Sequence, residues 1–154
     1  MSAISEKVNT ALYAKLNVSG VYSLTGTVSS GVGKIFEDKA PDDTSLPYVI
    51  YRRQGPGPIV YSFASSGVQP TFQMEDDLWL IKAVVDEDSD TTKGPQKLAE
   101  DILAACITAL GSSMTLSGNT VTAYYKFSDA AAYPERVNDR DIFHRGFLWR
   151  IAVT

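Results

Sequence analysis

Residues 74–85 read MEDDLWLIKAVV, and this stretch decides how the rest of the chain is arranged. Alternate residues of a β-strand point to opposite faces of its sheet, and here both sets are largely apolar. The sets are Trp79, Ile81, Ala83 and Val85 on one face, and Leu78, Leu80, Lys82 and Val84 on the other. A strand that is apolar on both faces is typical of a sheet's interior. We therefore expect a central strand covered on both sides, by helix or by a neighbouring chain.

Two amphipathic helices are expected beside this strand. Residues 3–16 and 95–110 carry apolar side chains at the spacing of one helical face. Pro95 suits a first helical turn, and Gly111 suits the cap that ends the helix. The stripes are Ile4, Val8, Leu12 and Leu16 in the first helix, and Leu98, Ile102, Cys106, Ala109 and Leu110 in the second. Each stripe must be buried against a sheet or another helix.

Further strands are predicted where β-branched and aromatic residues gather. These segments are 34–37, 47–53, 59–63, 121–127 and 141–153. Strict alternation places Val121, Ala123, Tyr125 and Phe127 together, and in the last strand Phe143, Phe147, Trp149, Ile151 and Val153 together. Because the last two strands follow each other closely, we expect them to pair antiparallel. The order predicts an α+β fold in which two helices pack on a mostly antiparallel sheet.

The connections are expected to be loops. Residues 17–33 are rich in Ser, Gly, Val and Thr, and we expect a loop there with a short strand at 21–24. Residues 54–73 begin with a Gly-Pro repeat and are expected to form an extended loop or arm, exposed over 64–73. The length of 154 residues suits one domain, and no linker divides the chain, so we expect a single domain over 1–154.

Composition excludes several kinds of chemistry. The chain has 14 basic and 18 acidic residues, a net charge of −4, which argues against the basic surface of a nucleic-acid binder. One cysteine, Cys106, excludes an internal disulfide, and one histidine, His144, weakens most catalytic triads. The N-terminal residues lack the apolar core of a signal peptide, and no apolar run reaches the length of a membrane span. We expect a soluble cytoplasmic protein, with no cofactor and no bound metal.

Three segments that could suggest a calcium site, a phosphate site or a reactive thiol do not meet the requirements of those sites. The acidic run 86–90 lacks the Gly and Glu that a calcium-binding EF-hand loop needs, and is expected to be a solvated loop before a helix. The segment 31–34 resembles a phosphate loop, but Ile35 stands where Ser or Thr is required. Cys106 lies on an apolar stripe and is expected to be a buried hydrophobe, whereas His144 is expected at the surface or an interface.

Four parts of the chain together resemble the tail-terminator or tail-completion proteins of long-tailed bacteriophages of the siphovirus type. The first is the N-terminal amphipathic helix, followed by KIFED at 34–38. The others, in order, are AP at 40–41 leading to PYVI at 47–50, LWLI at 78–81 with the helix that follows, and HRGFLWRI at 144–151. The resemblance covers most of the chain. Residues 54–73 are longer than the family's usual connection, and residues 75–77 are unusually acidic.

The resemblance implies a structural virion protein without enzymatic activity. Such proteins form a ring, commonly of six subunits, at the head-proximal end of the tail tube, where they stop tube growth. The partners implied are further copies of the chain, the major tail tube protein and a neck or head-completion protein, with no membrane; DNA passes through the lumen without specific binding. The residues expected at subunit or tube interfaces are Arg52, Arg53, Tyr61, Phe63, Glu75, Asp76, Asp77, His144 and Arg145.

Three alternatives remain open. A neighbouring neck protein, such as a head-closure or head–tail connector protein, has the same kind of size and composition. A small hydrolase would use Asp76, Asp86 or His144, although nothing in the sequence brings these together. A ligand-binding domain would line an apolar pocket with Trp79 and Trp149, for which core packing is the simpler interpretation.

Overall fold

The computed structural model describes residues 3–54, 59–62, 72–90 and 92–154. Two helices begin and end where the sequence predicts, namely α1 (Ala3–Leu16) and α3 (Pro95–Leu110). Their predicted stripes supply buried residues in both helices, including Leu12, Ile102 and Cys106. The fold is α+β, as expected.

The prediction of a loop over residues 17–33 is wrong. Its first part is a third helix, α2 (Ser19–Thr25), and its second part is a hairpin of β1 (Thr27–Ser29) and β2 (Val32–Gly33). The short strand expected at 21–24 therefore does not form. Ser and Gly disfavour helix, but Val21 and Thr25 lie one turn apart and are both buried, so tertiary packing overrides local propensity.

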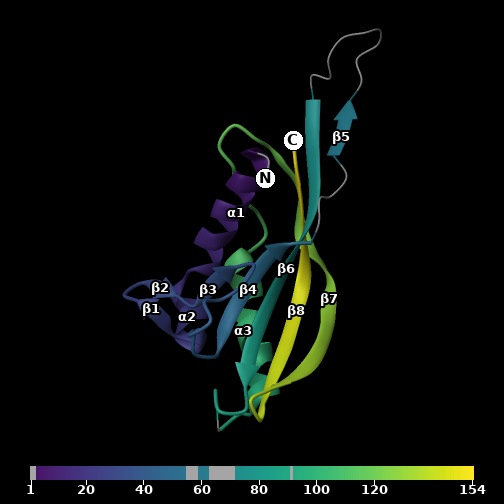
Figure 1. Cartoon of the computed structure of the whole chain (residues 1–154). Coiled ribbons are helices and arrows are strands. Elements are labelled where there is room, and N and C mark those ends of the chain that lie inside the picture. The colour runs from purple at the N-terminus through teal and green to yellow at the C-terminus, as the bar shows by residue number, and fades with distance from the viewer. Residues whose placement is uncertain (1–2, 55–58, 63–71, 91) are drawn as a thin grey trace.

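The remaining strands form one twisted sheet, shown in Figure 1. Its order is β3 (Ile35–Glu37), β4 (Tyr48–Arg53), β6 (Phe72–Asp86), β8 (Arg140–Val153) and β7 (Val121–Val137). Only β3 and β4 pair in parallel, and every other pairing between described strands is antiparallel. The short β5 (Ile59–Ser62) pairs with the start of β6, beyond the end of β8, so these two strands project from the sheet.

β6 is the central strand that the sequence predicts. Trp79, Ile81, Ala83 and Val85 all face the helices and are fully buried there. Phe147, Trp149, Ile151 and Val153 of β8 join them, which confirms the predicted face of that strand. The core therefore lies between the helical layer and one face of the sheet.

The opposite face, which we call the open face, carries none of the helices of the described chain. Helices α1, α2 and α3 all pack into the core on the Trp79 side. The open face nevertheless contains Leu78, Leu80 and Leu148. The sequence predicted that this face is covered either by a helix or by a neighbouring chain. The helix is wrong, and the neighbouring chain stays a prediction.

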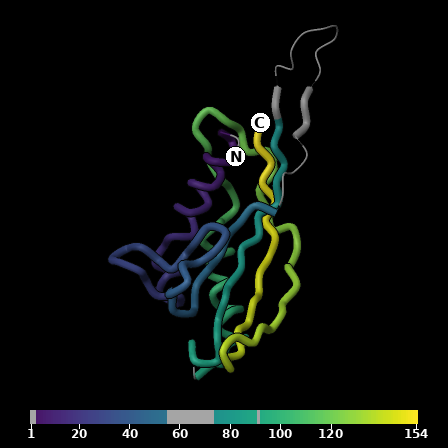
Figure 2. The backbone as a smooth tube through the Cα atoms, viewed as in Figure 1, coloured from purple at the N-terminus to yellow at the C-terminus, as the bar shows by residue number. Residues whose placement is uncertain are grey.

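Strand β7 is ten residues longer than predicted and does not alternate as expected. Its 17 residues replace the seven of 121–127, and its pairing with β8 shifts register at three places. The shifts fall between Val121 and Ala123, between Lys126 and Ser128, and between Ala130 and Tyr133. Figure 2 shows β7 bowing away from β8 along this stretch. Because each shift turns the following side chains, Tyr125 and Phe127 are exposed while Tyr124 packs against Trp149.

Candidate functional site

The acidic residues 75–77 divide between the two faces of β6. Glu75 and Asp77 point toward the helices and are 2% and 3% exposed. The Ser5 hydroxyl donates to Glu75 Oε2 at 2.8 Å, and Arg53 Nη2 lies 2.7 Å from Asp77 Oδ1. Both carboxylates therefore have partners within the chain.

Asp76 points the other way, onto the open face, and pairs with Arg150 of β8. The Arg150 guanidinium donates to both carboxylate oxygens, with Nε lying 2.9 Å from Oδ1. These hydrogen bonds lower the pKa of Asp76, because they favour its charged form. The same guanidinium donates to the Tyr125 hydroxyl at 2.8 Å, which ties the bowed strand β7 to the sheet.

His144 also lies on the open face but is only 8% exposed, so the first part of the prediction, a surface position, is wrong, and the second part, an interface position, stays a prediction. The Tyr133 ring stacks on the imidazole, with centroids 4.5 Å apart, and Glu135 Oε2 lies 2.8 Å from Nε2. Burial lowers the pKa of His144, while the bond to Glu135 acts in the opposite direction. Register shifts in β7 bring Tyr133 over the ring, and no alternation rule could have located that contact.

The other predicted interface residues are dispersed. Arg52 is exposed on the open face, whereas Arg145 lies on the helix side and pairs with Glu100 at 2.6 Å. Tyr61 belongs to β5, where it pairs with Gln73. Phe63 lies outside the described residues. The structure thus gathers only Arg52, Asp76 and His144 on one face, and the interface roles of all these residues stay predictions.

Sequence reasoning missed a hollow of about 590 Å³ on the open face. We call it the leucine hollow. Its lining consists of Arg52, Gln54, Leu78, Leu80, Lys82, Asp129, Ala130, Ala131, Tyr133, Gly146 and Leu148. Leu78 and Leu80 are visible in the sequence as part of the second apolar face of β6. Leu148 of β8, and the bow in β7 that forms the wall of the hollow, are not.

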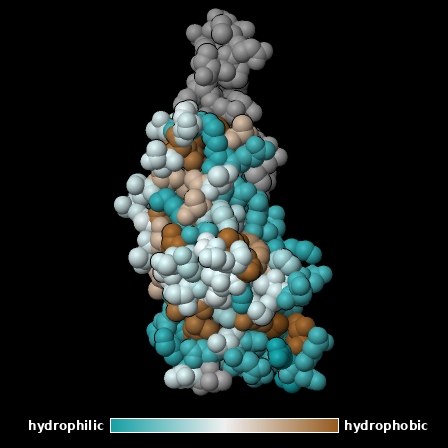
Figure 3. Space-filling model, turned by 90° about the vertical axis from the view of Figure 1, so that its left-hand side faces the viewer, coloured by the Kyte–Doolittle hydropathy of each residue, from teal (hydrophilic) through white to brown (hydrophobic). Residues whose placement is uncertain are grey.

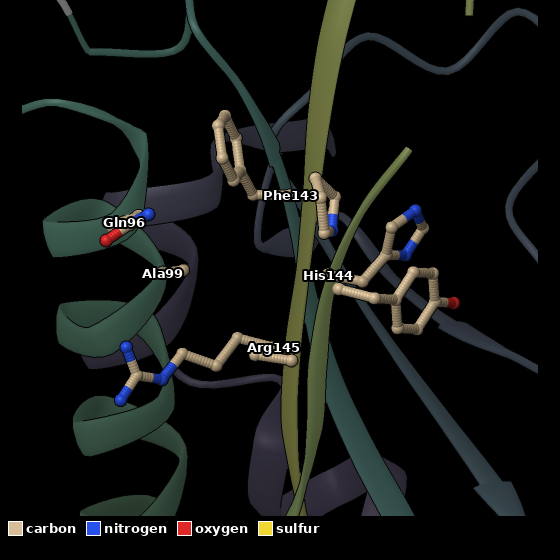
Figure 4. A pocket seen from close by; sticks show the side chains of 8 residues that line it. Gln96, Ala99, Phe143, His144 and Arg145 are labelled. Carbon is tan, nitrogen blue, oxygen red and sulfur yellow. The ribbon is translucent and has the colours of Figure 1, made fainter. Parts of the chain in front are cut away.

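A smaller cleft of about 240 Å³ lies where α3 meets β7 and β8. Figure 4 shows Phe143 and Arg145 pointing from β8 toward α3, where Gln96 and Ala99 lie, and His144 pointing to the other side. Arg145 is held by its ion pair with Glu100 on α3. His144, the titratable base in the lining, points away from α3, and its Nε2 lies 2.8 Å from Glu135 Oε2.

The structure separates the single thiol from the single histidine. Cys106 is fully buried on the helix side, where burial raises its thiol pKa to about 12, and the sheet separates it from His144 on the open face. In the acidic loop, Asp90 accepts from the backbone N–H groups of Thr92 and Lys93. Within the described parts of the chain, no cluster of three potential metal ligands occurs.

Trp79 and Trp149 are core residues, not the walls of a ligand pocket. They are 0% and 4% exposed, and both belong to the apolar core between the helices and the sheet. The interpretation of core packing is therefore confirmed. No helix in the described segments is long and apolar enough to cross a membrane.

The arrangement defines a class of fold: an α+β domain with one helical layer on a mostly antiparallel sheet, whose second face lacks helical cover in the described chain. A similar fold occurs in a chain of the virion of a native gene transfer agent particle. The match has a TM-score of 0.59 and 18% sequence identity, and covers 99% of each chain. No protein-family model and no curated protein matches this sequence.

Proposed function

We propose that this chain is a structural virion protein that caps the head-proximal end of a phage tail tube as a ring of six copies. The observation that carries the proposal is the likeness in fold to a virion chain over essentially the whole of both chains. The ordered segments KIFED, PYVI, LWLI and HRGFLWRI, which resemble tail-terminator proteins, support the same assignment.

The chemistry of the described residues agrees with a structural role that depends on contacts between protein surfaces. The single histidine is buried against Tyr133, and the single thiol is in the core. A ring requires a heterologous contact, in which two different surfaces of each subunit meet and the rotation closes. In this proposal DNA passes through the ring, and the net charge of −4 limits the counterion-release binding that would hold it.

The test is to add the purified protein to polymerising tail tube protein and to measure tube lengths and tube ends by electron microscopy. We expect tubes that stop growing and carry a ring at one end. Unchanged tube length with bare ends would refute the tail-terminating role. Binding to the neck-facing surface of heads, without any effect on tubes, would instead identify the alternative, a head-closure or head–tail connector protein.

A further inference from the structure

The leucine hollow contains two cationic side chains, of which Lys82 donates a hydrogen bond to the Tyr133 hydroxyl at 3.3 Å. Arg52 on β4 and Lys82 on β6 both line it, and neither forms an ion pair with another of the described residues. Register pairs Arg52 with Leu80 and Ile50 with Lys82, so the two cations are diagonal neighbours on one face. Diagonal neighbours lie roughly 7–8 Å apart, close enough to meet two adjacent carboxylates. The third charged side chain of the hollow, Asp129, is already paired with Lys126 at 2.6 Å.

The complementary surface lies at the β3 edge of the sheet. The connection between β3 and β4 carries Asp42, whose side chain is 98% exposed, and the exposed Asp43 beside it. Val28, Phe36 and Pro41 lie beside Asp43, together with Lys34, whose ammonium group is bonded to Ser45. Asp42 forms a solvent-exposed ion pair with Lys39 at 3.7 Å, whereas no ion pair of Asp43 occurs among the described residues. Figure 3 views the molecule from this side and shows apolar patches between hydrophilic ones. We call this surface the acidic edge.

We propose that the acidic edge of one copy docks into the leucine hollow of the next, with Asp42 and Asp43 facing Arg52 and Lys82. The sheet order places β3 at one edge and β7 at the other, and the two surfaces share no lining residue. Such a contact is heterologous, so a pair of copies keeps one hollow and one acidic edge free for further copies. The inference rests on the proposed function only for the closure of this contact into a ring.

Charge complementarity favours a second copy as the occupant. The hollow combines leucines with two cations that have no ion-pair partner in the described chain, and the acidic edge combines two exposed carboxylates with Val28 and Pro41. The apolar side chains provide most of the buried contact area. The charges determine which two surfaces meet, and repulsion between like charges disfavours contact between two hollows.

The first experiment is a charge swap, read by sedimentation velocity over a range of protein concentrations. We expect Arg52→Glu with Lys82→Glu to weaken self-association roughly tenfold or more, and Asp42→Lys with Asp43→Lys to do the same. Mixing the two variants should restore association, because every contact between unlike variants again joins opposite charges. The control, Lys93→Glu with Lys97→Glu near the start of α3, makes the same change in net charge as the first variant and should leave association unchanged.

Each variant is first checked for native circular dichroism, and Arg52→Glu alone serves if the double variant misfolds. Failure of the mixture to associate, or an equal loss in the control, overturns the contact.

The second experiment detects the contact directly. Lys82→Cys in one protein and Asp43→Cys in another should give a disulfide-linked heterodimer under mild oxidation with copper phenanthroline. The pair Lys97→Cys and Asp43→Cys should not, and native Cys106 is buried. A wild-type protein that stays monomeric, together with no cross-link, overturns the proposal.

The two proposals fail in different ways. If the protein caps tube ends but shows no link between positions 82 and 43 on those ends, the contact is wrong and the proposed function stands. If the cross-link forms but tubes are never capped, the contact stands and the tail-terminating role fails.

Discussion

Replacing Gly146 with alanine tests the packing of the two central strands. Gly146 of β8 pairs with Lys82 of β6 at the floor of the leucine hollow. A Cβ atom at this position would lie 2.6 Å from the Ile81 carbonyl oxygen and 3.2 Å from Lys82 Cα. Both contacts are with backbone, so no side-chain rotation relieves them and the two strands must move apart.

We expect Gly146→Ala to destabilise the protein by about 1–3 kcal/mol, the usual cost of overpacking. For a chain of this size, each kcal/mol lowers the melting temperature by about 2–4 °C, so the expected decrease is about 2–12 °C. Gly20→Ala is the matched control. Gly20 lies in α2, and no atom lies within 4 Å of the place that an alanine methyl group would take there. Alanine at this position should raise stability by at most about 0.5–1 kcal/mol.

The assay is urea unfolding followed by tryptophan fluorescence, because Trp79 and Trp149 are in the core. The two substitutions should change the free energy of unfolding in opposite directions. A Gly146→Ala protein as stable as the wild type would show that β6 and β8 tolerate a side chain there, and would refute the close approach of the two strands as a constraint.

Three further predictions concern titratable groups. Because burial lowers the pKa of His144, its neutral form stabilises the fold fully above the ordinary pKa of about 6.5, and this stability is lost as the pH falls from there through the folded pKa. Urea unfolding should show that the free energy of unfolding falls more between pH 7.5 and pH 5.5 for the wild type than for His144→Asn. Equal decreases in the two proteins would contradict the predicted role of His144. Because Arg150 lowers the pKa of Asp76, wild type should exceed Asp76→Asn in stability at pH 7, and the difference should shrink at pH 3, as the carboxylate is protonated. A constant difference would count against the pair. Cys106, with a thiol pKa of about 12, should not react with Ellman's reagent at pH 8 until urea unfolds the protein; prompt reaction of the native protein would mean that the thiol is accessible.

The sequence allowed the principal elements to be predicted because their signals are local. Pro95 and Gly111 bracket an uninterrupted apolar stripe, and α3 occupies the predicted range. The double apolar face of residues 74–85 likewise identified the central strand. Periodicity and terminal residues are both encoded within about one element's length, so no tertiary information was needed.

What could not be predicted depends on contacts between distant segments. Helix α2 forms because Val21 reaches the core, not because Ser19 or Gly20 favour helix. The second half of β7 contains Asp129 and Pro134, which are poor strand formers, and it forms because β8 provides a long partner. The partition of Glu75, Asp76 and Asp77 between two faces was predictable from alternation, but their partners Ser5, Arg53 and Arg150 were not.

The construction of β7 favours the leucine hollow over the β7 edge as a surface for the proposed association. β7 lies at the edge of the described sheet, and a long edge strand exposes backbone groups that pair readily with other chains. Three register shifts interrupt its ladder, Pro134 removes an N–H donor, and Lys126 and Asp129 add charge. Each of these features opposes pairing between edges. The same shifts bow β7 outward and form the wall of the hollow, so a single departure from regular pairing both protects the edge and creates a side-chain surface. The proposed association through that surface would be selective because it depends on matched charges, whereas pairing between backbone edges does not.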